Sequence, residues 1–427
     1  MKRVLIYSHD TFGLGNIRRM LEVARHLVEA SPEVSALVVT GSPQLQAMRL
    51  PPRVDTVKLP CLARDVDGHY GARFLDLSLA RTVRLRANLI RSTIADYAPD
   101  LILVDKKPFG VEDELAAAFA EGPAAGVRPR RVLLLRDILD SPEATRHVWR
   151  KNGCFEAIEA YYDEVLVLGS PEIFDLREEY AFPPFAAAKV RFCGYIARQR
   201  GARGRDALRR EWHLHEGEPL VLVTPGGGED GHALVRTWLQ GLQGLPDRLR
   251  PRSHIVFGPE MAEAPRTALQ ALARTMPQVS LQVFSDDMMS LMAAADVVVS
   301  MGGYNTVCEL LSLPRRAVVV PRVKPGQEQA LRAERMAARG FLRCVHPDGL
   351  SPAALMQAVQ HELQAHADGH PLPRLGDMQG LARCSAALLR QLDLEPRSTT
   401  ADPSFPFARN TAWNRHATTA HAPSACS

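Results

Sequence analysis

The sequence is short of cysteine and has almost no excess of charge of either sign. Its 7 cysteines in 427 residues form no C-x-x-C pair and no Cys/His cluster with zinc spacing, which excludes a small disulfide scaffold and favours a reducing compartment. Lys and Arg number 52 against 48 Asp and Glu, far from the basic surplus of a dedicated nucleic-acid binder. We therefore expect no nucleic-acid partner.

Long apolar runs are also missing. The longest are a few residues, whereas a membrane-spanning helix needs about 20. The N-terminal apolar stretch turns polar at residues 8–10, which is too early for a signal peptide. The chain is 46% hydrophobic and 23% charged, as expected of globular proteins rather than disordered ones. A cytoplasmic protein is the expectation.

Short runs rich in Val, Ile and Leu recur along the chain and alternate with stretches at helical spacing, such as residues 16–29. Continuous apolar character is typical of strands buried on both faces of a parallel sheet. The predicted strands are residues 4–7, 36–39, 101–104, 132–135, 165–168, 220–223, 254–257, 297–299 and 317–320. This alternation predicts an α/β protein with two doubly wound, Rossmann-like domains whose parallel sheets face each other across a cleft.

The strand runs fall into two groups, which predict the domain boundaries. Residues 1–193 form the first domain and residues 207–395 the second. Between them, residues 194–206 are basic, contain glycine and are poor in large apolar side chains, as a linker is. Residues 396–427 show no apolar periodicity, so we expect a disordered tail.

Open parallel sheets bind ligands beyond the carboxyl ends of their strands, so the loops there are the candidate site. In the first loop, Gly13 and Gly15 permit a tight turn, and a helix opening at Asn16 offers free N–H groups. His9 and Asp10 stand at the strand end, and both can transfer protons. A plain strand-to-helix turn is the alternative.

A second loop holds three consecutive glycines, Gly226, Gly227 and Gly228. Without side chains, the backbone there can approach a pyrophosphate closely. It is no P-loop, because no G-K-[ST] follows. A plain turn again is the alternative.

The third loop breaks a strand at Gly302 and Gly303, and a helix is predicted to open at Asn305 or Thr306. Glu309 would then lie in the first helical turn and face the cleft, where a carboxylate can bind a ribose diol. The alternative is a glutamate that only complements the helix dipole.

The fourth loop, residues 320–330, places Glu328 and Gln329 at a helix start, where polar side chains can bind sugar hydroxyls. A solvated first turn is the alternative. The arginine-rich residues 81–91 indicate a helix with a solvated basic face, with membrane-surface contact as the second interpretation. The acidic pairs at 65–67 and 286–287 occur too commonly by chance to indicate a metal site.

The order and spacing of these loops resemble the GT-B glycosyltransferases, above all the family-28-type branch that includes the peptidoglycan lipid-linked N-acetylglucosaminyltransferase. Residues 284–288, 295–300 and 302–309 carry the closest likeness. Residues 194–198 resemble the family segment whose arginine, here Arg198, meets the donor diphosphate. The resemblance covers roughly residues 1–395.

This resemblance implies an inverting, metal-independent transferase with a UDP-sugar donor and no other cofactor. The nucleotide base would lie on backbone near Ser285, with Met288 also among the donor-binding residues, and Glu309 would hold the ribose. The donor-binding set is completed by Arg198, Gly226, Gly227, Gly228, Gly302, Gly303, Asn305, Thr306, Glu328 and Gln329. A carbohydrate or lipid-linked acceptor would lie against the first domain. Peripheral contact of the protein with the inner face of the membrane is a second interpretation of its location.

Two positions depart from the family pattern. The family's Gly-His in the first loop is Gly15-Asn16 here, and an asparagine cannot accept a proton at neutral pH. His9 or Asp10 is therefore the expected catalytic base. The phosphate-loop serine is replaced by Gly228, which keeps only the backbone donor. Nucleotide-sugar hydrolysis or epimerisation, and a non-catalytic nucleotide-sugar-binding subunit, stay open as alternatives.

Overall fold

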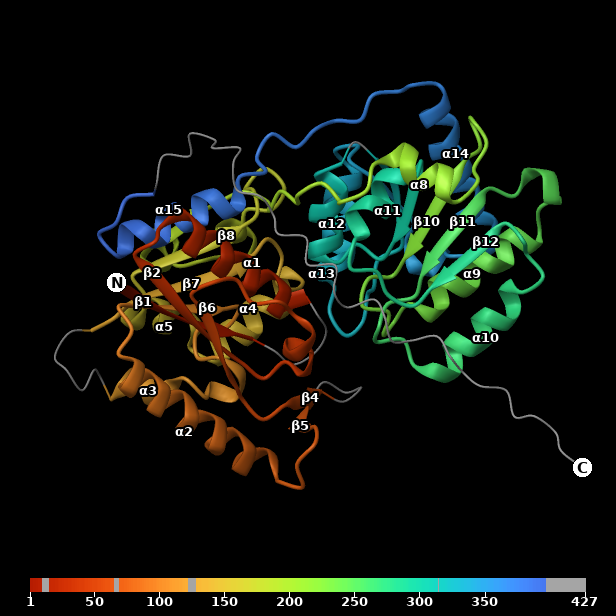
Figure 1. The fold of residues 1–427 in the computed structure, drawn as a ribbon. Helices are drawn as coiled ribbons and strands as arrows, with labels where there is room; N and C mark the ends of the chain where they lie inside the picture. The colour runs from red at the N-terminus through yellow and green to blue at the C-terminus, as the bar shows by residue number, and fades with distance from the viewer. Residues whose placement is uncertain (10–14, 65–68, 122–127, 314, 397–427) are drawn as a thin grey trace, which may run out of the picture.

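Two all-parallel sheets, each covered by helices, make up the computed structural model (Figure 1), which describes residues 1–9, 15–64, 69–121, 128–313 and 315–396. The first sheet has the order β3-β2-β1-β6-β7-β8-β9. Its strands are β1 (Lys2–Ser8), β2 (Val34–Thr40), β3 (Val54–Lys58), β6 (Leu101–Asp105), β7 (Arg130–Arg136), β8 (Glu164–Leu168) and β9 (Val190–Phe192).

The second sheet has the order β12-β11-β10-β13-β14-β15. Its strands are β10 (Leu220–Thr224), β11 (Arg252–Val256), β12 (Val279–Gln282), β13 (Val297–Ser300), β14 (Arg316–Val319) and β15 (Arg343–Cys344). All the predicted strands occur in these two sheets, which confirms the predicted α/β class. The antiparallel hairpin of β4 (Leu62–Arg64) and β5 (Tyr70–Ala72) stands apart from both sheets.

Helices connect the strands and cover both faces of the sheets. In the first half they are α1 (Gly15–Ala30), α2 (Leu79–Tyr97), α3 (Ala116–Ala120), α4 (Pro142–Lys151), α5 (Cys154–Tyr161), α6 (Leu176–Glu179) and α7 (Pro184–Ala187). In the second half they are α8 (Arg205–Glu211), α9 (His232–Gln243), α10 (Glu263–Ala273), α11 (Met288–Ala294), α12 (Tyr304–Leu311), α13 (Glu328–Ala337), α14 (Pro352–Ala367) and α15 (Gly380–Gln391).

The sequence explains where several of these helices begin and which face α1 buries. Ser78, Ser141 and Ser351 each accept a hydrogen bond from the first turn of α2, α4 and α14, satisfying a backbone donor that the helix leaves free. In α1 the apolar residues recur at helical spacing and are buried against the first sheet: Ile17, Met20, Leu21, Val23, Ala24, Leu27 and Val28.

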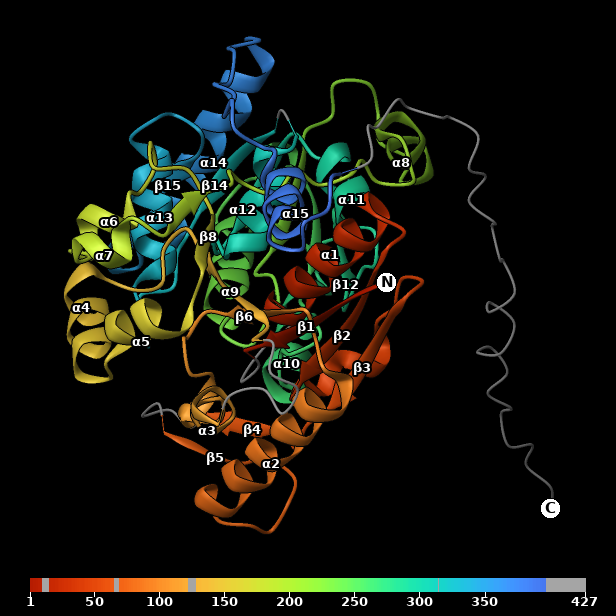
Figure 2. The ribbon, with the colours of Figure 1, turned by 90° about the vertical axis from the view of Figure 1, so that its left-hand side faces the viewer.

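The last helix corrects the predicted boundary between the halves. The sequence analysis assigned residues up to 395 to the second domain, but α15 packs on α1 and β8 of the first (Figures 1 and 2). The returning chain pairs with the outgoing chain just before α15: the Tyr195 N–H donates to the Asp377 carbonyl at 3.0 Å. The predicted linker, residues 194–206, also runs into α8, which begins at Arg205.

One apolar core continues from the first half into the second. It joins α1 and α15 to Tyr195, Tyr304 and Cys308 in a single cluster of buried side chains. Within the described ranges, no helix combines the length and apolar character needed to cross a bilayer. The predicted disordered tail, apart from Pro396, lies outside the described residues.

Candidate functional site

Both sheets reverse their strand order at one point, and these two points mark the candidate site. In the first sheet the reversal lies between β1 and β6, and in the second between β10 and β13. Ligands of open α/β sheets bind beyond the strands at such a point. The helices that follow β1 and β13 meet across the cleft: the side-chain amide of Asn305 donates to the Gly15 carbonyl at 3.1 Å.

His9 directly follows β1 and is fully buried. Its N–H donates to Asp105 Oδ2 at 3.3 Å, and neither ring nitrogen has a hydrogen-bond partner among the described residues. Burial, followed by the charges of Lys106 and Lys107, holds the pKa of His9 well below its usual value. The imidazole is therefore neutral near pH 7, the state in which it can accept a proton. Asp10 and Gly13 lie outside the described residues.

Asn16 connects the start of α1 to His9 and Arg19 by hydrogen bonds. Its Nδ2 donates to the His9 carbonyl at 2.5 Å, and Arg19 Nη2 donates to its Oδ1 at 3.2 Å. Arg19 also pairs with Asp105 at 2.6 Å, with both side chains buried. The asparagine thus has a structural role, since it connects the start of α1 to the residue that follows β1.

The glycine loop after β10 requires glycine for its shape. Gly226 and Gly228 have φ of +87° and +98°, and a Cβ on Gly228 would lie 2.3 Å from the Phe257 carbonyl oxygen. A Cβ on Gly226 would lie 3.8 Å from Thr306 Oγ1. The predicted loops after β10 and β13 are therefore neighbours in space.

Carboxylates lie beside this glycine loop, a feature that the sequence did not predict. A Cβ on Gly227 would lie 2.5 Å from Glu260 Oε2. Burial, followed by the charge of Asp230, raises the pKa of Glu229, and burial followed by Glu229 raises that of Glu260. Arg322 counters this negative charge through a 2.9 Å pair with Asp230.

The helix of the third loop begins earlier than predicted. Gly303, not Asn305 or Thr306, is the N-cap, and α12 starts at Tyr304. A glycine cap accepts the extended backbone (φ −57°, ψ 151°) without a side-chain hydrogen bond, so the capping preference of Asn and Thr did not decide the boundary. The correction moves Glu309 from the first helical turn to the second.

Glu309 nevertheless faces the cleft. Its side chain is 4% exposed, and its Oε1 lies 3.1 Å from Arg18 Nη1 of α1 in the opposite half. Asn305 Oδ1 accepts a hydrogen bond from Arg198 Nη2 at 2.9 Å. Three predicted donor-binding residues, Arg198, Asn305 and Glu309, are therefore gathered at the junction of α12 with α1.

The segment before α11 is tied to the linker. Asp287 caps α11 by accepting from the Ser290 N–H at 3.1 Å, and it also accepts from the Ala202 N–H at 3.2 Å. Ser285 is buried, and its hydroxyl accepts from the Asp287 N–H at 3.2 Å. Met288 packs partly buried against the core. Asp287, one member of the acidic pair at 286–287, thus has a structural role.

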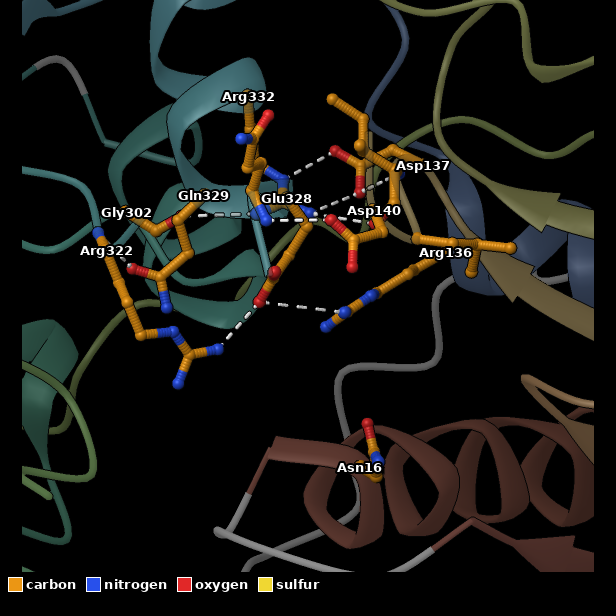
Figure 3. A network of polar contacts seen from close by, with 12 residues as sticks. Asn16, Arg136, Asp137, Asp140, Gly302, Arg322, Glu328, Gln329 and Arg332 are labelled. Carbon is orange, nitrogen blue, oxygen red and sulfur yellow. Dashed lines mark hydrogen bonds and ion pairs between the residues drawn. The ribbon is translucent and has the colours of Figure 1, made fainter. Parts of the chain in front are cut away.

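Glu328 opens α13 between two arginines (Figure 3). Its Oε1 lies 2.8 Å from Arg322 Nη2 and 3.8 Å from Arg136 Nη2, the latter from the opposite half. Burial alone would raise the pKa of Glu328, but Arg136, Arg322 and Arg332 together lower it to about 2. Gln329 Oε1 accepts from the Arg322 N–H at 3.1 Å and so holds the loop after β14.

A fully buried ion pair joins the two halves beside this loop. Arg332 of α13 donates from Nε and Nη2 to the Asp137 carboxylate at 2.7 and 2.8 Å, and both side chains are 0% exposed. Tyr195 donates to the same carboxylate at 2.9 Å, and Arg332 Nη1 donates to the Gly302 carbonyl at 3.3 Å. The pair therefore links a strand end of the first sheet to the third loop (Figure 3).

Sequence reasoning missed four cationic residues near the junction of the two halves: Arg18, Lys106, Arg136 and Arg332. Lys106 and Arg136 follow predicted strands, so the rule that located the loops could have located them. Arg18 and Arg332 lie within helices, and their partners are 291 and 195 residues away along the chain.

Comparison with known proteins adds the family. Residues 220–371 match the glycosyltransferase family 28 C-terminal domain. An uncharacterized glycosyltransferase of Methanopyrus kandleri is 28% identical over 57% of this chain, and the match spans 64% of that relative's length. A UDP-N-acetylglucosamine--N-acetylmuramyl-(pentapeptide) pyrophosphoryl-undecaprenol N-acetylglucosamine transferase of Clavibacter michiganensis is 27% identical over 92% of this chain and 96% of its own.

Solved structures share the fold. MurG of Acinetobacter baumannii superimposes with a TM-score of 0.53 at 14% identity, over 93% of this chain and 96% of the other. A UGT transferase of Siraitia grosvenorii in complex with UDP gives 0.57 at 12% identity over 92% of this chain and 100% of the other. The resemblance inferred from the motifs is confirmed: this chain carries a glycosyltransferase family 28 C-terminal domain and has the architecture of a family-28-type GT-B glycosyltransferase.

Proposed function

We propose that the protein transfers a sugar from a UDP-linked donor to an acceptor hydroxyl, with inversion at the anomeric carbon and without a bound metal. The observation that carries the proposal is the family 28 domain whose loops after β10 and β13 adjoin each other, with Asn305 of α12 contacting the first residue of α1. The family resemblance supports UDP and inversion, and the fold supplies a donor site between two sheets.

In this proposal the second half holds the donor. Glu309 binds the ribose hydroxyls, and Arg198 with the backbone of Gly227 and Gly228 binds the diphosphate. Since Arg18 pairs with Glu309 in the present structure, the ribose diol replaces the guanidinium when the donor binds. The backbone N–H groups of the loops stabilise the negative charge that develops on the leaving UDP.

The acceptor lies against the first half, near the end of β1. Its hydroxyl oxygen attacks C1 of the donor sugar as the bond between C1 and the diphosphate oxygen breaks. UDP leaves with the bonding electrons, and the hydroxyl proton passes to a base. His9 is neutral and at the strand end, and Asp10 follows it, so these two residues are the proposed bases.

We further propose that the first half contacts the cytoplasmic face of a membrane, which suits a lipid-linked acceptor such as the names of several relatives describe. Large apolar side chains are exposed around α2, at the extremity of the first half (Figure 1): Phe74, Leu75, Leu85 and Leu89 are 69%, 45%, 40% and 38% exposed. Arg81, Arg84 and Arg91 are exposed on the same helix. Apolar and basic side chains together are typical of interfacial helices.

The test is release of UDP from a panel of UDP-sugars by the purified chain, with and without saccharide and polyprenyl-linked acceptors. Acceptor-dependent UDP release supports transfer. Release without any acceptor identifies a hydrolase instead, and tight UDP-sugar binding with no release identifies a binding subunit. His9→Ala, with donor affinity retained and turnover lost, would assign the base to His9.

A further inference from the structure

Three cationic side chains converge on the cleft around one buried carboxylate. Arg136 ends β7 in the first half, and Arg322 follows β14 in the second; they reach Glu328 at 3.8 and 2.8 Å. Figure 3 shows the two guanidinium groups approaching Glu328 from opposite sides, with Asn16 of α1 facing them. The cluster therefore spans the two halves at the place where donor and acceptor would meet.

Lys106 is the third cation, and it lies beside Arg136. β6 and β7 are neighbouring parallel strands, and the Lys106 N–H still donates to the Leu134 carbonyl at 2.9 Å. Its φ of +72° is rare for a residue with a side chain. Among the described residues its ammonium forms no hydrogen bond or ion pair, and the adjacent Asp105 is paired with Arg19 at 2.6 Å.

The two guanidinium groups have two carboxylates between them, so the ammonium of Lys106 is the charge left over in this cluster. Arg322 has both Asp230, at 2.9 Å, and Glu328, whereas Arg136 has only the longer contact to Glu328. The Nε groups of Arg136 and Arg322 are buried and have no hydrogen-bond partner among the described residues. Burial, followed by Arg136, lowers the pKa of Lys106 to about 7. A partly buried ammonium without a partner is costly, and an anionic ligand would remove this cost.

We propose that Lys106, Arg136 and Arg322 form a subsite for an acidic group, a carboxylate or a phosphate, carried by one of the two substrates. Guanidinium groups bind both kinds of anion through paired hydrogen bonds. The proposal rests on the proposed function, because it places this acidic group beside Glu328 and Gln329, where the donor sugar is expected. The acidic group belongs either to the donor sugar, as a uronate, or to the acceptor.

The experiment uses ligand pairs that differ by one charge. UDP, UDP-glucose and UDP-glucuronic acid are titrated calorimetrically into the full chain, and inorganic phosphate is titrated into both the UDP-saturated and the nucleotide-free chain. Lys106→Gln and Arg136→Gln are the test variants. Arg335→Gln is the control, since Arg335 lies on α13 but pairs with Glu179 at 2.6 Å, outside the subsite.

A preference for UDP-glucuronic acid over UDP-glucose of about tenfold, lost in both test variants and kept in the control, places the acidic group on the donor. Phosphate binding that the same variants weaken about tenfold, without such a preference, places it on the acceptor. If neither ligand responds to the variants while UDP binds normally, the subsite is wrong. If UDP does not bind at all, the proposed function is wrong instead. The phosphate titrations of the variants would then still test the subsite.

Discussion

At the scale of single residues, Glu309 carries the most specific prediction. It is buried and held by Arg18, so Glu309→Ala removes the proposed ribose acceptor and leaves Arg18 free in the cleft. We expect UDP affinity to fall about tenfold or more, since a lost hydrogen bond between charged and polar groups is worth about 1.5–3 kcal/mol. Calorimetry measures it, with the exposed Glu263→Ala as control. Equal UDP affinity in the wild type and Glu309→Ala would remove Glu309 from the ribose role.

Lys106 predicts a pH dependence of stability. Its pKa is about 7 in the folded chain against an ordinary value of 10.5, so between these pH values the unfolded chain binds more protons. Stability therefore rises with pH across this window. Lys106→Met should flatten this rise, and the exposed Lys151→Met should not. Denaturant unfolding at pH 7, 8 and 9 gives the slopes; identical slopes for the wild type and Lys106→Met would contradict the prediction.

At the scale of elements, the loop after β10 depends on Gly228. Its φ is +98°, and an alanine Cβ there would lie 2.3 Å from the Phe257 carbonyl oxygen, so the substitution forces the loop to move. Backbone strain of this kind costs about 1–3 kcal/mol. We expect Gly228→Ala to lower stability by that amount and to weaken UDP binding. Gly349→Ala, which meets no atom within 4 Å, is the control. If Gly228→Ala changed neither stability nor UDP affinity, the loop would adopt another backbone conformation without cost, and the prediction would be wrong.

The elements also show how far the sequence predicts the fold. Central strands such as β1 and β13 are buried on both faces, so continuous apolar runs identify them. The strands that were missed lie at sheet edges or are short: β3, with the sequence VDTVK and a half-exposed pattern, resembles a loop in composition. The start of α12 was predicted within two residues, because Gly303 gave no side-chain capping signal.

The parts of the site that follow strand ends could be predicted from the sequence. The contacts that join the two halves could not. The rule that ligands bind beyond parallel strands found the loops that hold His9, Gly228 and Glu309. The ion pairs across the cleft connect residues about 200 or more positions apart, and local spacing carries no information about such partners. The return of α15 to the first half was missed for the same reason, since its helical pattern does not indicate which sheet it covers.

At the scale of the whole molecule, we expect the buried pair of Asp137 and Arg332 to fix the orientation of the two halves relative to each other. Removing Arg332 alone leaves the Asp137 carboxylate buried with, among the described residues, the Tyr195 hydroxyl and the Ile138 N–H as its donors and no counter-charge, and breaking such a pair costs about 3–5 kcal/mol. We expect Arg332→Met to lower the free energy of unfolding by that amount. Arg335→Met, on the same helix but half-exposed, should cost less than about 1 kcal/mol. Equal losses in both variants would contradict a special role for the buried pair.

The central claim is that the cleft between the two sheets binds a uridine nucleotide. Calorimetric titration of the purified full-length chain with UDP, GDP and TDP, under one buffer and salt condition, tests it most directly. The account predicts saturable binding of UDP, weaker binding of GDP and TDP, and loss of UDP affinity in Glu309→Ala. Absence of binding for all three nucleotides would contradict it, because the glycine loops would then be turns that preserve the fold without its ligand.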